Sequence, residues 1–141
     1  LNNAAELHGV IRTAHGSVEL AAGDSTDNDI VMLAPIPSNA AVTQLFVGSD
    51  ALGGSCTYNV GIYQTDGTVK DEDVFATLVA DEAALADVRF EAANIDTSSK
   101  KLWELAGDSS DPGGYFYIAV TFAATGGTAG SLAWNISYVV N

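Results

Sequence analysis

Residues Asp29 to Gln64 read DIVMLAPIPSNAAVTQLFVGSDALGGSCTYNVGIYQ, in which three apolar segments alternate with two groups of turn-forming residues. The apolar segments are 29–34, 41–48 and 56–63. Apolar side chains at every second position, bounded by Pro and Gly, are typical of half-buried β-strands. Pro35 and Pro37 are expected to end the first strand, and Gly53-Gly54 to turn the chain towards the third. The connections are too short for crossover helices, so antiparallel pairing is expected.

Similar segments flank this central region. Alternating strands are predicted over 9–20, 115–124, 130–140 and 88–95, and the strands at 115–124 and 130–140 are expected to form a hairpin. Residues 74–79 fit either a strand or the start of a helix. Short helices are predicted over 81–87, with Asp81 as N-cap, and over 100–106, where Gly107 suits the end of the helix.

About eight strands with two short helices in the connections predict an all-β fold, a two-sheet antiparallel sandwich that is jelly-roll-like. The absence of a repeat period disfavours a propeller or a solenoid. Residues 9–141 are predicted to form a single β-sandwich domain. Residues 1–8 show no periodic pattern and are predicted to be an extended N-terminal arm, which either frays or lies on a neighbouring subunit.

The charge balance excludes several classes of partner. The chain carries 18 acidic side chains and only 5 Lys and Arg, a formal net charge of −13. Nucleic acids and anionic membranes both attract clustered cations, whereas this chain has a single adjacent pair, Lys100-Lys101. No apolar run approaches the ~20 residues that a membrane helix needs, and no signal peptide is visible. A surface this acidic repels copies of itself except where an interface is built.

The sequence offers little that could perform chemistry. His8 and His15 are the two histidines, and neither stands in a catalytic signature. Cys56 is the single cysteine and is predicted to be a small buried hydrophobe. Asp24, Asp27 and Asp29 are candidate Ca²⁺ ligands, as are the acids of 71–73, but neither set matches a calcium-binding loop. We therefore expect solvated loop charges, no metal, no cofactor and no enzymatic activity.

Aromatic side chains support an alternative function. Exposed Tyr and Trp side chains build platforms on which sugars stack, and the candidates are Tyr63, Trp103, Tyr115, Tyr117 and Trp134. Trp134 lies on the apolar face of its strand and is expected in the core. Trp103, on a short amphipathic helix, fits either the core or a contact surface. A carbohydrate- or receptor-binding module of a virion is therefore the second hypothesis.

The order of turns and strand ends resembles that of a family of small tailed-phage virion proteins. The similar segments lie between about residues 10 and 140 and are Pro35-Ile36-Pro37-Ser38-Asn39-Ala40, Asp50-Ala51-Leu52-Gly53-Gly54-Ser55, Val60-Gly61-Ile62-Tyr63, Asp66-Gly67, Leu102-Trp103-Glu104-Leu105-Ala106-Gly107, Asp111-Pro112 and Gly130 to Tyr138.

This resemblance implies a head decoration (cement) protein with a jelly-roll-like sandwich. It implies that the protein lies on the outer surface of the capsid, forms a homotrimer, and bridges and stabilises subunits of the major capsid protein. The family supplies no catalytic residues. Expected interface residues are Leu1, Asn2, Asn3, Leu7, Trp103, Tyr115 and Tyr117, which combine the predicted arm with aromatic side chains.

Overall fold

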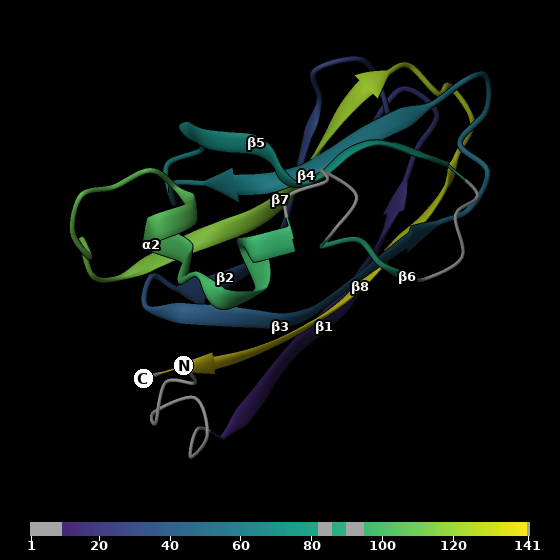
Figure 1. Cartoon of the computed structure of the whole chain (residues 1–141). Helices are drawn as coiled ribbons and strands as arrows, with labels where there is room; N and C mark the ends of the chain where they lie inside the picture. The colour runs from purple at the N-terminus through teal and green to yellow at the C-terminus, as the bar shows by residue number, and fades with distance from the viewer. Residues whose placement is uncertain (1–9, 82–85, 90–94, 141) are drawn as a thin grey trace.

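The computed structural model describes residues 10–81, 86–89 and 95–140, which form two four-stranded antiparallel sheets (Figure 1). In spatial order the first sheet contains β1 (Ile11–Leu20), β8 (Gly130–Val140), β3 (Ala40–Ser49) and β6 (Ala86–Asp87). The second sheet contains β2 (Ile30–Pro37), β7 (Tyr115–Ala124), β4 (Thr57–Tyr63) and β5 (Val69–Ala80). The predicted all-β, two-sheet antiparallel sandwich is confirmed.

The strand order is that of a jelly roll. Antiparallel pairs join β1 to β8, β2 to β7, β3 to β6 and β4 to β5, as in a long ribbon that is folded in half and wrapped into two layers. The expected hairpin between 115–124 and 130–140 is wrong, because β7 and β8 belong to different sheets. Both strands bury one face against the same core, and the alternation of apolar residues does not reveal which strand each will pair with.

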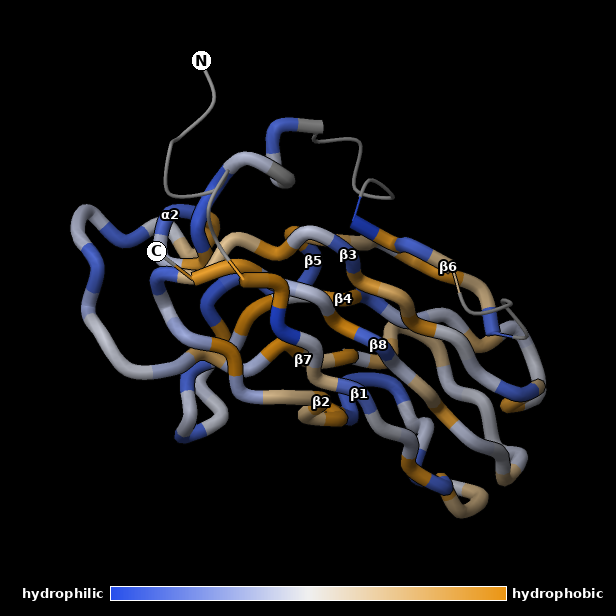
Figure 2. Tube along the Cα trace, turned by 90° about the horizontal axis from the view of Figure 1, so that it is seen from below, coloured by the Kyte–Doolittle hydropathy of each residue, from blue (hydrophilic) through white to orange (hydrophobic). Residues whose placement is uncertain are grey.

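The core lies between the sheets and is filled by the alternating apolar residues of the inner strands. Its largest fully buried side chains include Tyr58, Phe122, Leu45, Ile62, Ile118, Leu132 and Ile136. The rings of Tyr58 and Phe122 meet edge to face, with centroids 6.2 Å apart. Burial raises the pKa of Tyr58 to about 12, so the phenol stays neutral. Figure 2 shows the hydrophobic colouring concentrated along the strands, while most of the loops are hydrophilic or intermediate.

Strand β2 continues through both of its prolines. Pro35 pairs in register with Tyr117 and Pro37 with Tyr115, so the expectation that Pro35 ends the strand is wrong. Because β2 is the outermost strand of its sheet, a residue without an N–H group is tolerated on the side that has no neighbouring strand.

Strand β5 crosses over the outer face of its own sheet. Its pairing with β4 shifts register three times, and a Cβ on Gly61 would overlap the backbone of Asp71 and Glu72. Farther along, the N–H of Leu78 donates to Oδ1 of buried Asn59 at 2.8 Å. Residues 74–79 are therefore part of a strand, and that strand also includes the polar residues before them.

Two short helices, η1 (Ile95–Ser99) and α2 (Leu102–Leu105), precede β7. Leu102 and Leu105 of α2 are buried in the core, which confirms a short helix within 100–106. The helix predicted over 81–87 is wrong at Ala86 and Asp87, which form β6, while residues 82–85 lie outside the described part of the chain. No described helix has the length and hydropathy needed to cross a membrane.

Candidate interaction surfaces

The described residues hold no group of three or more His, Cys, Asp or Glu side chains placed to bind a metal ion. His15 lies on the exposed side of β1, in register with Asn135, and His8 lies outside the described residues. Cys56 is buried, as predicted. Burial and, to a smaller extent, the carboxylate of Asp81 raise the pKa of its thiol, which opposes formation of the reactive thiolate.

The acids of the β1–β2 loop hold the loop together. The Asp24 carboxylate accepts the N–H of Ala21 at 2.8 Å, and that of Asp29 accepts the N–H of Thr26 at 3.1 Å. The backbone N–H of Asp27 donates to the Thr125 hydroxyl. The carboxylates of Asp24 and Asp29 thus serve as local turn contacts, while Asp27 contributes its backbone N–H to a contact with the distant Thr125. None of these three candidate Ca²⁺ ligands is part of a described metal-binding group.

The four edge strands of the sandwich differ in how open they are to a further strand. Strand β2 contains two prolines, β5 has three register shifts, and β6 is only two residues long. Strand β1 has none of these features, because its ten residues pair with β8 in a continuous register. Among the described residues nothing pairs with β1 on its other side. A long, regular edge of this kind is a template for pairing with another chain.

A groove of about 470 Å³ runs between β1 and β2, where the edges of the two sheets face one another. Its apolar lining consists of Val18, Leu20, Ile30, Val31 and Met32, and its acidic lining of Glu19, Asp24 and Asp29. Ile30 is 44% exposed, although it is a large apolar residue. Sequence reasoning missed this groove. The available signal was the distribution of cations, since no Lys or Arg occurs between Arg12 and Lys70.

A second, smaller pocket of about 250 Å³ lies at the other end of the second sheet. Its lining includes Tyr115, which is 59% exposed, together with Gln64 and the ion pair of Lys70 and Asp108, whose Nζ and Oδ1 atoms lie 2.7 Å apart. The start and the end of β2 are in register with Thr121 and Tyr115 respectively. At ~3.3 Å per residue, roughly 20 Å therefore separates the two ends.

The other predicted interface residues are distributed differently. Trp103 is partly buried and packs against the core, and its backbone N–H donates to the Ser38 carbonyl at 3.1 Å. Trp134 is also partly buried against the core. Tyr117 is half-buried in the middle of its sheet. Leu1, Asn2, Asn3 and Leu7 lie outside the described residues, so the predicted arm stays a prediction.

The outer face of the first sheet is almost free of charge. The uncharged face is defined here as the outward-facing residues Thr13, His15, Ser17, Gln44, Phe46, Ala133 and Asn135, which the registers of β1, β8 and β3 place side by side. Ser137 points to the same side but is buried. Glu19 and Asp87 lie at the margins of this face. In a chain with a net charge of −13, a sheet face whose described outward-facing residues include no carboxylate adds little repulsion of its own when two copies meet there.

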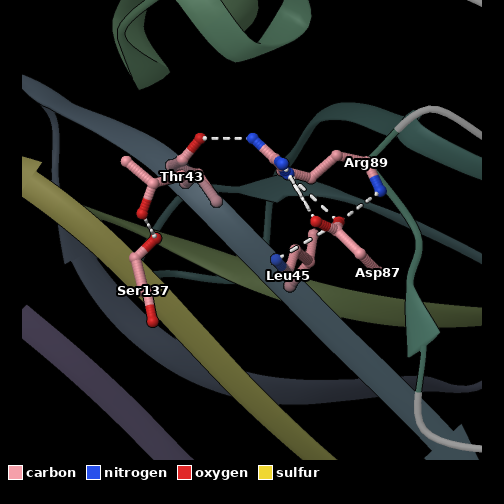
Figure 3. Close-up of polar contacts among 6 residues, drawn as sticks. Thr43, Leu45, Asp87, Arg89 and Ser137 are labelled. Carbon is pink, nitrogen blue, oxygen red and sulfur yellow. Dashed lines mark hydrogen bonds and ion pairs between the residues drawn. The ribbon is translucent and has the colours of Figure 1, made fainter.

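An ion pair that was not predicted lies at one margin of the uncharged face (Figure 3). The Asp87 carboxylate on β6 accepts a hydrogen bond from the Arg89 guanidinium, with Nη2 and Oδ2 2.9 Å apart. The same carboxylate also accepts a hydrogen bond from the Leu45 N–H at 3.4 Å. Arg89 in turn donates to the Val42 carbonyl on β3. The Thr43 hydroxyl beside them donates to the Ser137 carbonyl. These contacts attach the short strand β6 to β3 and neutralise its carboxylate.

Comparison with known proteins reveals a likeness of fold. The structure is similar to a chain of the cyanophage Pam1 capsid asymmetric unit, with a TM-score of 0.53 and 15% identity over 94% of this chain and 86% of that chain. A chain of the acid-stable capsid of Helicobacter pylori bacteriophage KHP30 gives a TM-score of 0.41 and 14% identity over 93% and 94% of the two chains, too distant to add to this. No protein-family model and no curated protein matches the sequence. At 15% identity the Pam1 likeness establishes a shared fold.

Proposed function

We propose that this protein is a structural component of a phage virion, which decorates the outer surface of the capsid and bridges subunits of the major capsid protein. The observation that carries the proposal is the jelly-roll fold, shared over 94% of the chain with a chain of a phage capsid asymmetric unit. The turn and strand-end motifs that resemble phage decoration proteins support the same conclusion. A net charge of −13 suits a surface that does not contact the packaged genome.

The proposed assembly is a homotrimer. A closed ring of three copies needs the same heterologous contact repeated three times. We assign the uncharged face to one side of this contact, because a partner that packs on it does not have to desolvate or neutralise carboxylates there. Several copies held on one lattice then bind strongly even when each single contact is modest.

The test is addition of the purified protein to undecorated phage heads. Co-sedimentation of the protein with the heads, together with a rise in the temperature at which the heads release their DNA, is the expected result. An image of the decorated particle should place the protein outside the shell. Heads that neither bind the protein nor gain stability would contradict the proposal.

A second candidate function is carbohydrate binding at the Tyr115 pocket. An exposed aromatic ring beside an amide and an ion pair is the combination of a stacking surface and polar groups that sugar recognition requires. Glycan-array binding that Tyr115→Ala abolishes and Thr77→Ala leaves intact would support this function. Trp103→Ala is a poor probe, because Trp103 packs against the core.

A further inference from the structure

We propose that the groove between β1 and β2 binds an extended segment of a partner protein, which pairs with β1 as an added strand and carries Lys or Arg beside apolar side chains. This inference goes beyond the proposed function, since it names a surface and a partner chemistry and holds wherever the protein lies in a particle.

The first support is the edge of β1 with which no described residue pairs. An antiparallel strand directs about half of its N–H and C=O groups to each side, and β8 pairs with only one side of β1. Ten residues in unbroken register present a continuous row of backbone partners. An incoming strand gains main-chain hydrogen bonds from this row, and pockets beside it select alternate side chains.

The second support is the apolar lining beside that edge. Val18 and Leu20 reach the groove from β1, and Ile30, Val31 and Met32 reach it from β2. No described element covers the two sheets here, and Ile30 has 44% of its surface exposed. Side chains on the core-facing side of an added strand would cover these residues, with the gain that apolar burial gives.

The third support is charge, which decides between possible occupants. Glu19, Asp24 and Asp29 line the groove, and its lining contains no Lys or Arg that could neutralise them. The hydrogen bonds that Asp24 and Asp29 accept from the backbone fix their positions and leave their charges in place. A second copy of this chain would bring a further net charge of −13, so a cationic segment of another protein is the better complement.

The test uses three fluorescein-labelled ten-residue peptides with blocked ends. The first alternates valine with threonine and lysine, the second has glutamate in place of lysine, and the third is the lysine peptide with N-methylated alternate residues. We expect the lysine peptide to bind in fluorescence anisotropy at low salt, and the glutamate and N-methylated peptides to bind at least tenfold more weakly. Hydrogen exchange should show new protection confined to β1.

Paired variants locate the site. Glu19→Lys should weaken binding of the lysine peptide about three- to tenfold, because the attraction between the exposed Glu19 carboxylate and the lysines of the peptide becomes a repulsion. The matched variant Glu72→Lys, with the same change of charge on β5, should stay within twofold of the unmodified protein. Ile30→Ser should weaken binding, whereas Val69→Ser, a similarly exposed apolar residue on β5, should not.

Three results would overturn the proposal. These are equal binding of the lysine and glutamate peptides, protection of a strand other than β1, and self-association of the protein through β1 at micromolar concentration, which would make a second copy the occupant. Because the peptides need no phage heads, failure here leaves the proposed capsid function to its own test. Failure to bind heads likewise leaves the peptide result standing.

Discussion

Gly61 lies so close to Asp71 that any side chain at position 61 would overlap the Asp71 carbonyl. Val60 and Ile62 on either side of Gly61 point into the core, so this contact lies on the outer face of the second sheet. The irregular strand β5 thereby packs its own backbone on the outer side of β4. No described strand lies over the uncharged face of the first sheet.

Gly61→Ala should destabilise the fold strongly, by about 3 kcal/mol or more, because the obstructing atoms are backbone and β5 would have to move. Gly113→Ala is the control, since Gly113 has a φ of 73° and no atom within 4 Å of its added Cβ. That variant should lose only about 1 kcal/mol of stability, which is the cost of placing a side chain on a left-handed backbone. Urea unfolding measures both losses, and similar values for the two variants would argue against the close approach.

Asp71→Asn should stabilise the protein at neutral pH. Partial burial and the neighbouring Asp73 raise the pKa of Asp71, so the ionised carboxylate disfavours the folded state at pH 7. Because the folded-state pKa lies above the unfolded value, this penalty disappears as the pH falls through the folded-state pKa. We expect a gain of about 0.5 kcal/mol at pH 7 in urea unfolding, since the group is partly exposed, and no gain near pH 3.

Asp66→Asn provides the control of opposite sign for this pH dependence. The Thr68 N–H donates to the Asp66 carboxylate and lowers its pKa. The stability that this hydrogen bond gives is present above the unfolded pKa and is lost as the pH falls through the folded pKa. Asp66→Asn should therefore lower stability at pH 7 and have no effect in acid. If both variants changed the stability at pH 7 in the same direction, the opposite pKa shifts assigned to Asp71 and Asp66 would be wrong.

Asp87→Ala should cost about 1–2 kcal/mol, because it removes the acceptor of the Arg89 guanidinium and of the Leu45 N–H at the attachment of β6. The matched ion pair is Lys100 with Asp96, whose side chains are 42% and 52% exposed, against 13% and 26% for Arg89 and Asp87. Lys100→Ala should change stability by less than about 0.5 kcal/mol. Thermal unfolding of the two variants distinguishes an ion pair that holds a strand from a surface pair.

Asn135→Asp should lower the oligomeric state, since it places a carboxylate in the middle of the uncharged face of every copy. Thr77→Asp adds the same charge to an exposed position of β5 and should leave assembly unchanged. Sedimentation velocity gives the masses of both. The uncharged face would not be the contact between copies if the unmodified protein sediments as a monomer, or if the two variants change the sedimenting mass equally.

Deletion of residues 1–8 should weaken capsid attachment or trimer formation more than it lowers the unfolding temperature, because this stretch of sequence shows no core pattern. Head co-sedimentation and a thermal melt on the same sample compare the two effects. An equal loss of both would mean that these residues belong to the sandwich.

The sequence by itself determined the class of the fold. Period-two alternation over segments such as 41–48 and 56–63 reflects the simple geometry of a strand that has one face in the core, and this geometry acts over a few neighbouring residues. The same local reasoning predicted a buried Cys56 and a short helix before β7. The charge of −13 likewise followed from composition alone, and it disfavours partners that attract cations.

Only the tertiary structure decided which strands pair and which surfaces are left open. Pro35 was expected to end a strand, but the edge position of β2 tolerates its missing N–H group, and an edge is a property of the whole sheet. The groove joins Glu19 and Ile30 because the consecutive strands β1 and β2 belong to different sheets. The Asp87–Arg89 pair attaches to Val42 because β6 and β3, which are distant in the chain, lie side by side. Alternation shows that a residue faces inward or outward, whereas its neighbours across the sheet depend on how the entire chain is wrapped.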